Sequence, residues 1–245
     1  MGVAVGDYDG DGRMDLFVTT FADDNYILFH NDGDGFFSDV SYPSGVGEAT
    51  IPNLGWATSF LDYDNDGIPD LFCANGHVYP EVDGVLKQTF RQPLQFFRGL
   101  GDGKFAEMPS AFASIPRISA RGGAVADVDN DGDLDIAVSV MDSRPLLLEN
   151  RGGNRLNWLR VSLRGVRSNR SGVGARVKVT AAGRTQYETL HAGESYLSSN
   201  DPRLHFGLGS VNEAQVEIVW PSGRLQKVGA VKANKELFLT EPEKD

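Results

Sequence analysis

The stretch DVDNDGDLD at residues 127–135 alternates aspartates around a glycine and runs into the apolar segment Ile136-Ala-Val138. The same pattern, D-x-D-x-D-G-x-x-D, occurs as DYDGDGRMD at residues 7–15 and as DYDNDGIPD at residues 62–70. The copies begin 55 and 65 residues apart, and each lies between two short apolar or small-residue runs. Three copies in the same context indicate an internal repeat in which an acidic loop joins two strands.

A second element follows each acidic loop. Its copies are ILFHNDGDGFF at residues 27–37, QFFRGLGDGKF at 95–105 and LLLENRGG at 146–153. They predict further strands joined by tight Gly/Asp turns. The middle repeat is longer, which indicates an insertion near residues 76–88. This order of strands and turns is typical of a propeller blade, so we expect an all-β fold with a partial propeller of about three blades.

Three blades are too few to close a ring, since propellers use about 4–8. An open array would leave exposed strand edges. We therefore expect the chain to be the C-terminal part of a longer propeller with upstream blades, or a partner to cover the edge. Its first residues, Met1-Gly-Val-Ala-Val-Gly-Asp7, have no signal-peptide pattern. No apolar stretch reaches the roughly 20 residues needed to span a bilayer.

The acidic loops predict three structural calcium ions. Ca²⁺ takes about 6–8 oxygen ligands in a forgiving geometry, whereas Mg²⁺ demands an octahedron and retains its waters. Each loop offers four aspartate side chains, the last of them bidentate, and one backbone carbonyl, from Arg13, Ile68 or Asp133. The predicted ligands are Asp7, Asp9, Asp11, Arg13 and Asp15; Asp62, Asp64, Asp66, Ile68 and Asp70; and Asp127, Asp129, Asp131, Asp133 and Asp135.

The alternatives to calcium loops are less consistent with the repeat. An EF-hand needs a Glu at loop position 12, where this chain has Val18, Cys73 and Val138 in β-forming runs. Solvated turn-forming aspartates or a glycosidase carboxylate pair would not require three aligned copies. The loop glycines Gly12 and Gly67, like the third, Gly132, mark positions where the chain must turn with positive φ.

The charge divides the chain in two. Residues 1–150 carry 25 acidic and 8 basic side chains, whereas residues 151–245 carry 9 and 15, so the net charges are −17 and +6. We expect one domain of calcium-binding blades over 1–150 and another over 151–245. The overall charge of −11 argues against a nucleic-acid partner. The single cysteine, Cys73, excludes an intramolecular disulfide and is expected to be buried.

Period-two alternation predicts half-buried strands at residues 158–163, 175–180, 186–190, 215–220 and 236–240. They indicate a small antiparallel β-sandwich. The basic residues Arg160, Arg164, Arg176 and Lys178 are expected to face solvent, with a weak site for anionic glycans as the alternative. The polar segment 191–205 contains His191, Glu194 and His205. Catalysis or zinc binding is a possible role for these three, and hydrogen-bonded turns are the simpler explanation.

The three loops resemble FG-GAP/VCBS repeats, the calcium-binding blades of integrin-type propellers. The tail resembles the ASPIC/UnbV domain through GVGAR at residues 172–176, GESYL at 193–197, NDPR at 200–203, HFGLG at 205–209 and WPSG at 220–223. Together these features are similar to the cartilage acidic protein-like family. The resemblance implies a seven-bladed calcium-binding propeller followed by a sandwich, an extracellular or periplasmic location, and no defined reaction.

From these features we expect a non-catalytic, extracytoplasmic binding or adhesion scaffold with structural calcium and an unidentified protein or glycan ligand. One alternative is an accessory enzyme of secondary-metabolite or polysaccharide metabolism, with its site on the propeller face or in segment 191–205. The other is a purely structural module of a longer chain. Removing His191, Glu194 and His205 would abolish turnover only in the enzyme.

Overall fold

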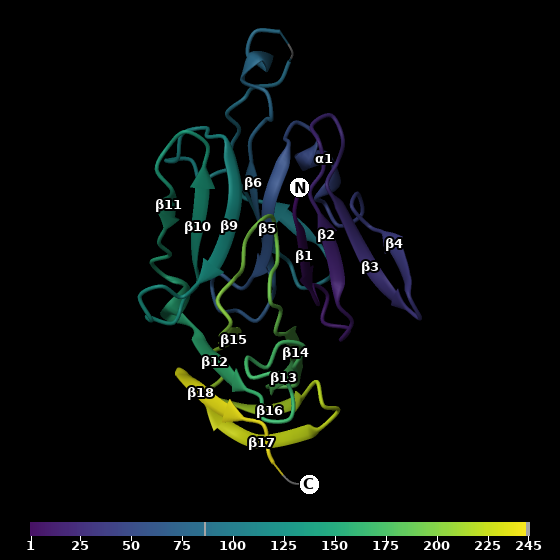
Figure 1. Cartoon of the computed structure of the whole chain (residues 1–245), viewed down its shortest axis with the longest axis vertical. Coiled ribbons are helices and arrows are strands. Elements are labelled where there is room, and N and C mark those ends of the chain that lie inside the picture. The colour runs from purple at the N-terminus through teal and green to yellow at the C-terminus, as the bar shows by residue number, and fades with distance from the viewer. Residues whose placement is uncertain (86, 244–245) are drawn as a thin grey trace.

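The computed structural model describes residues 1–85 and 87–243, and the protein is all-β with five small sheets. Three sheets lie side by side in one half of the molecule, and two are packed together in the other (Figure 1). The sheets of the first half are arranged as successive propeller blades, as the repeats predict. Leu86, inside the expected insertion, and the last two residues lie outside the described residues.

Each blade begins with the strand that precedes an acidic loop, and the loop leads into the second strand. The blades are β1 (Val3–Gly6), β2 (Asp15–Val18), β3 (Ile27–Gly33) and β4 (Phe36–Asp39); β5 (Gly55–Leu61), β6 (Asp70–Asn75), β7 (Gln95–Gly99) and β8 (Phe105–Glu107); and β9 (Ala120–Ala126), β10 (Asp135–Val140) and β11 (Leu146–Leu148). All neighbours within them pair antiparallel. The short helix α1 (Gly47–Thr50) links the first two blades.

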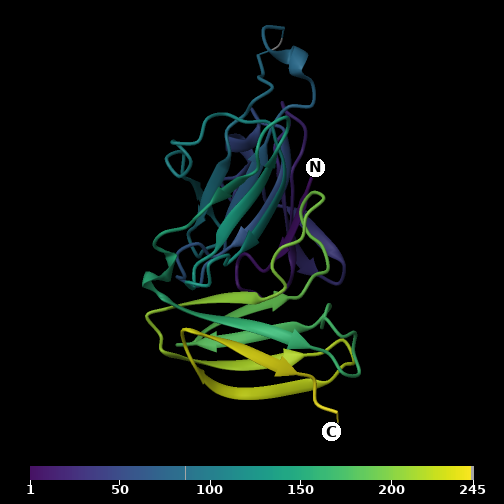
Figure 2. The same ribbon diagram turned by 60° about the vertical axis from the view of Figure 1, so that its left-hand side comes forward.

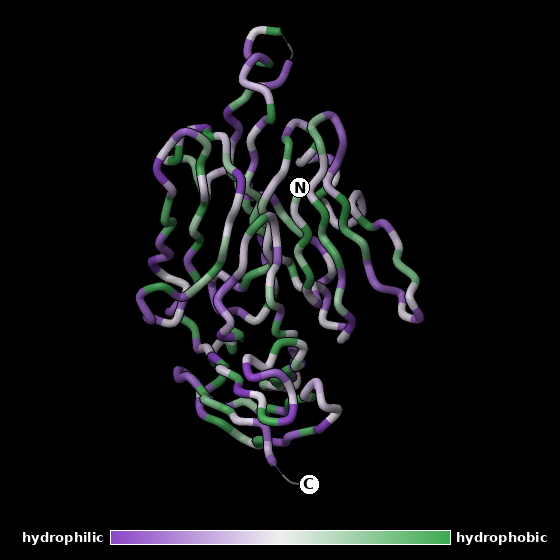
Figure 3. Tube along the Cα trace, viewed as in Figure 1, coloured by the Kyte–Doolittle hydropathy of each residue, from purple (hydrophilic) through white to green (hydrophobic). Residues whose placement is uncertain are grey.

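The blades pack face to face through two apolar cores. Phe17 and Leu28 of the first blade meet Leu71 and Phe97 of the second. Phe72 of the second blade packs with Ile136 of the third. Hydrophobic residues accordingly follow the strands, while hydrophilic ones gather at the loops (Figure 3). Cys73 is fully buried as expected, and burial raises the pKa of its thiol to about 12.

The end of the third blade differs from the prediction, and the insertion in the middle repeat can be placed in the structure. The hairpin expected after Leu148 does not form, because the chain passes through a 3₁₀ turn (Gly153–Arg155) into the first strand of the next sheet. The third blade therefore has three strands. The insertion of the middle repeat lies between β6 and β7, contains the 3₁₀ turn Pro80–Val82, and projects from the far end of the blades (Figure 1).

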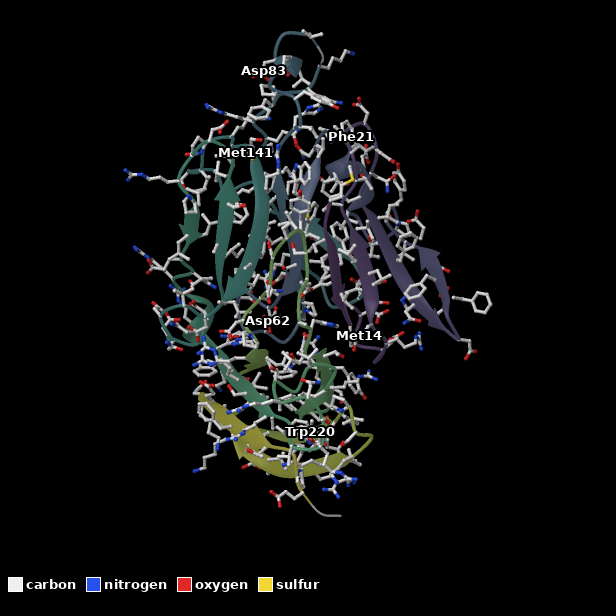
Figure 4. All side chains as sticks on the ribbon, viewed as in Figure 1. Met14, Phe21, Asp62, Asp83, Met141 and Trp220 are labelled. Carbon is white, nitrogen blue, oxygen red and sulfur yellow. The ribbon has the colours of Figure 1, made fainter. Side chains whose placement is uncertain are left out.

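The second half is a two-sheet sandwich. Its strands are β12 (Asn157–Arg164), β13 (Arg176–Ala181), β14 (Arg184–Thr189), β15 (Leu204–Gly209), β16 (Glu213–Val219), β17 (Leu225–Lys232) and β18 (Lys235–Thr240). The sheets have orders β15-β12-β18 and β14-β13-β16-β17. Their inner faces form one core around Trp220, which lies in this half in Figure 4.

The sandwich departs from the predicted antiparallel pattern at one pair. β18 runs parallel to β12, with Leu159 opposite Lys235 and Arg164 opposite Thr240. A parallel neighbour requires a long crossover, and here residues 165–234 supply it. Strands β15 and β17 were not predicted, because Gly207 and Gly229 interrupt their alternation.

The connection between β14 and β15 leaves the sandwich and enters the blades. Figures 1 and 2 both show it rising alongside β1, β5 and β9, which are the edge strands at the centre of the three sheets. Its residues bond to all three edges: Ser195 N donates to Val3 O at 2.9 Å, Thr58 N donates to Ser195 Oγ at 2.8 Å, and Val125 N donates to Asn200 Oδ1 at 2.9 Å. Part of the edge expected to be exposed is thus covered by the chain itself.

Candidate metal centres

The three acidic loops lie at the end of the blades that faces the sandwich, where Figure 4 places Asp62 and Met14. Their glycines Gly12, Gly67 and Gly132 have φ of +88°, +82° and +98°, the left-handed geometry expected from the motif. In each loop the amide of this glycine donates to the first aspartate, at 3.0, 2.8 and 3.0 Å respectively. The motif therefore folds into one loop conformation three times.

Several predicted ligands converge in each loop. The sets whose carboxylate oxygens lie within 4.8 Å of one another are Asp7, Asp9 and Asp15; Asp62, Asp64 and Asp66; and Asp127, Asp129 and Asp135. Asp11 converges instead with Asp9 and His30, while Asp70 and Asp131 belong to none of these sets. The carbonyl contributions of Arg13, Ile68 and Asp133 stay a prediction, as does the complete ligand set.

The last aspartate of each motif accepts hydrogen bonds from two backbone amides, which the sequence analysis did not predict. Asp15 accepts Asn31 N at 2.8 Å and Tyr8 N at 3.3 Å, one on each oxygen. Asp70 does the same with Gly99 N and Tyr63 N, and Asp135 with Asn150 N and Val128 N. These residues tie the loop to the start of the second element. We call this hydrogen-bonding role bracketing. It is additional to the predicted role of the same aspartates as bidentate metal ligands.

The electrostatics of the loops favour a cation. Burial, together with the charges of neighbouring aspartates, raises the pKa of Asp7 to about 6, that of Asp15 to about 7 and that of Asp62 to about 8. Carboxylates held close together in partly buried positions bind either protons or a counter-ion. Because the aspartate donors are oxygens, they fit a hard cation such as Ca²⁺, which would screen the repulsion within each loop.

A side chain at the same repeat position approaches the first two loops. His30 Nδ1 lies 3.3 Å from Asp9 Oδ2 and 3.6 Å from Asp15 Oδ1. Arg98 Nη2 lies 3.3 Å from Asp64 Oδ2. Both precede the final residue of the strand motifs ILFHN and QFFRG, so the internal repeat carried a signal for them. His30 is a further candidate ligand of the first loop.

The expectation that Arg160 faces solvent is wrong. This residue is buried, and its Nη1 lies 2.5 Å from Asp127 Oδ2 of the third loop. Its Nη2 lies 3.3 Å from Glu236 Oε2. Polar and apolar residues alternate along β12 as predicted, but at Arg160 the blades cover the polar face of the strand. Arg176 likewise turns toward the blades, where its Nη2 donates to Gly12 O.

Other sandwich residues bind the second and third loops. Arg184 Nη1 donates to Asp66 O at 3.1 Å, and His205 Nε2 lies 2.6 Å from Asn65 Oδ1. At the third loop, Arg203 Nη2 donates to Asp127 O at 2.9 Å. Each of the three loops is thus held by the sandwich, which places the candidate metal centres at the junction of the two halves.

The residues of the alternative catalytic site line one cavity of about 110 Å³ at this junction. His191, Glu194 and His205 all contribute to its wall, together with Glu188. Glu194 is engaged in structure, since it accepts Val5 N at 3.3 Å and Asn200 Nδ2 at 2.9 Å. Burial and the nearby charge of Arg160 lower the pKa of His205 to about 3, so its ring is neutral.

Two family models match separate stretches of the chain. A family model described as an FG-GAP-like repeat matches residues 7–73 and 78–138, and one described as ASPIC and UnbV matches residues 165–245. Among the described residues, none of the helices has the length and apolar character to cross a membrane.

Three curated relatives share sequence with nearly the whole chain. Cartilage acidic protein 1 of Homo sapiens is 29% identical over 250 residues, which cover 98% of this chain and 36% of the relative. The Xenopus tropicalis protein of the same name is 26% identical over 297 residues, covering 100% and 45%. The Mus musculus protein is 28% identical over 250 residues, covering 99% and 37%. The chain spans less than half the length of these relatives.

Proposed function

Because this chain belongs to the family of FG-GAP-like repeat proteins, we propose that it is a calcium-binding, non-catalytic scaffold that presents a binding surface outside the cytoplasm. The observation that carries the proposal is the threefold convergence of aspartate oxygens in one loop conformation. Calcium would be structural in each loop, where it joins the first two strands of a blade. The ligand of the scaffold would be a protein or a glycan.

The loop chemistry supports calcium over other ions. All the converging groups are carboxylates except His30, and hard oxygen donors select Ca²⁺ or Mg²⁺ over softer metals. The hydrogen bonds within each loop fix an irregular set of oxygens, which suits the flexible coordination of Ca²⁺ better than a strict octahedron. Extracellular calcium modules bind with Kd values of about 10⁻⁴–10⁻³ M. Such sites would fill outside the cytoplasm.

Exposed apolar side chains support the proposal that these blades belong to a larger propeller. Phe36 and Phe37 on β4 are exposed, as is Leu147 on β11, and both are outer strands of their sheets. Upstream blades of a longer chain, or a partner protein, would cover such surfaces. A purely structural role within a longer chain would use the same contacts but bind no further ligand.

The cavity at the junction favours one alternative, an accessory enzyme acting on a secondary metabolite or polysaccharide. Glu188 and His191 line this cavity and make no hydrogen bond through their side chains within the described residues. Substituting His191→Gln and Glu188→Gln would abolish turnover of chromogenic glycosides or esters if the cavity were catalytic. A scaffold would show no turnover to lose, and its calcium binding would be unchanged.

Calcium titration of matched variants tests the proposal. Asp7→Asn, Asp62→Asn and Asp127→Asn each remove one charge from the first position of one loop. We expect isothermal titration calorimetry to detect three sites in the wild-type protein and the loss of one site in each variant. Asp102→Asn, on an exposed turn outside the loops, is the control and should leave the stoichiometry at three. A wild-type protein that binds no calcium would refute the proposal.

A further inference from the structure

Arg160 and Asp127 form a buried ion pair between the sandwich and the third acidic loop. Their side chains are only 6% and 1% exposed. We propose that Arg160 is a built-in cation of the third loop, which competes with calcium for Asp127 and makes this site weaker than the other two. The inference rests on the proposed calcium binding, and it assigns different affinities to loops that share one sequence motif.

The surroundings of Arg160 hold it in place. It lies on β12, which is paired on both sides by β15 and β18. Glu236 Oε2 on β18 lies 3.3 Å from Nη2 of Arg160, and the ring of Trp158 lies 5.4 Å from the guanidinium carbon. Moving this arginine would leave the buried Asp127 carboxylate without its cation and would break the pair with Glu236, which costs much more than moving a surface arginine. The guanidinium therefore stays beside Asp127 when calcium approaches.

The other two loops have arginine neighbours of a different kind. Arg13 pairs with Asp11 in the first loop and Arg98 with Asp64 in the second, and these arginines are 43% and 46% exposed. Exposed ion pairs contribute little, because the side chains exchange freely with water. Calcium can displace them without burying an uncompensated charge. Only in the third loop, among the described residues, is the first aspartate bound by a buried cation.

The competition has a simple physical basis. In every loop the first aspartate accepts two backbone amides of its own loop, so its remaining negative charge is what a metal ion uses. At Asp127 the guanidinium already neutralises part of that charge on Oδ2. It also repels a divalent ion in a partly buried position, where charges are weakly screened. We expect the affinity of the third loop to be about tenfold lower than that of the others.

A tryptophan beside the third loop can serve as a spectroscopic reporter of metal binding. The indole nitrogen of Trp158 lies against Gly132, so close that a Cβ at this glycine would overlap it. The first and second loops instead contain Tyr8 and Tyr63. Trp158 also stacks on His205, which contacts Asn65 of the second loop. Terbium bound in place of calcium can therefore be detected through tyrosine at the first loop and through tryptophan at the second and third, so the last part of the tryptophan signal to saturate reports the weakest of these sites. Trp56 and Trp220 lie on β5 and in the sandwich core.

The experiment is a terbium and calcium titration of the full chain, read by both signals and by calorimetry. In the wild type, the tyrosine signal should saturate at about tenfold lower metal than the tryptophan signal. Arg160→Met should bring the two curves together. Arg160→Lys, which keeps the charge, should leave them apart, and Arg98→Met should change neither by more than about twofold.

The outcomes separate this inference from the calcium proposal. Coincident curves in the wild type, or an Arg160→Met protein with curves still tenfold apart, would overturn the role of Arg160 while leaving calcium binding intact. Absence of any metal binding would overturn the proposed function itself. If Arg160→Met fails to fold, the order of filling in the wild-type protein still decides, because that comparison needs no variant.

Discussion

The first and third acidic loops share a motif and a conformation but differ in what surrounds them. Among the described residues, no sandwich cation pairs with Asp7 of the first loop, where Arg176 binds only the backbone oxygen of Gly12. His30 from the same blade lies beside the neighbouring carboxylates. Asp127 in the third loop is bound by Arg160 from the other half of the molecule. Local sequence thus sets the shape of each loop and its oxygens, whereas contacts from far along the chain set the charge that those oxygens meet.

The largest expected difference between the two loops lies at their glycines. Gly132→Ala would force a Cβ into the ring of Trp158 at a φ of +98°, so we expect a loss of about 3–4 kcal/mol in the free energy of unfolding. Gly12→Ala meets only the edge of Tyr187, at 3.1 Å, and should cost about 1–2 kcal/mol. Chemical denaturation in excess calcium measures both. Equal losses would mean that the sandwich does not press on the third loop.

The bracketing aspartate should matter even without metal. Asp15→Ala leaves the amides of Asn31 and Tyr8 without an acceptor, which should destabilise the EDTA-treated protein by about 2–3 kcal/mol. Asp9→Ala loses one exposed bond from Asp11 N and a contact with His30, and should cost less than about 1 kcal/mol under the same conditions. If both variants were equally stable in EDTA, the last aspartate would serve only as a metal ligand.

A smaller effect concerns pH. Burial raises the pKa of Asp62 and Asp70 from 3.8 to about 8, so the metal-free folded protein binds more protons than the unfolded chain between about pH 4 and pH 8. Its stability should therefore fall as the pH rises through this window. Saturating calcium should remove most of the fall, because the ion replaces the protons. Thermal melts across this range, with and without EDTA, measure the slope.

The pH dependence of stability should also differ between the second loop and the third. Burial raises the pKa of Asp127, but Arg160 opposes the shift. Asp62→Asn should therefore flatten the pH dependence of the metal-free protein more than Asp127→Asn does. If Asp127→Asn flattened the pH dependence more than Asp62→Asn, Arg160 would not be the group that neutralises Asp127 in the third loop.

Much of the blade half could be predicted from the sequence, because its information is local. The repeated D-x-D-x-D-G-x-x-D motif specifies the loop turn, and the flanking apolar runs specify the two strands it joins. The positive φ of Gly12, Gly67 and Gly132 follows from the same motif. The position of the middle insertion followed from the unequal spacing of the repeats.

The junction between the halves could not be predicted in this way. Arg160 lies 33 residues from Asp127 on another sheet, and an alternating strand reads the same whether its polar face meets water or an acidic loop. The path of residues 191–203 along β1, β5 and β9 depends on polar side chains such as Ser195 and Asn200, which bind backbone amides of the blades, and those amides carry no sequence signature. The parallel pairing of β18 with β12 likewise depends on chain topology and not on residue pattern.

The most direct test of the account is differential scanning calorimetry of the intact chain with excess calcium and with EDTA. Three structural ions, each at about 100 times its Kd, would stabilise the folded state by about 2.7 kcal/mol per site. We predict that calcium raises the Tm by on the order of 10 °C or more, and that EDTA reverses the change. A melting temperature and heat capacity that respond to neither calcium nor EDTA would contradict it.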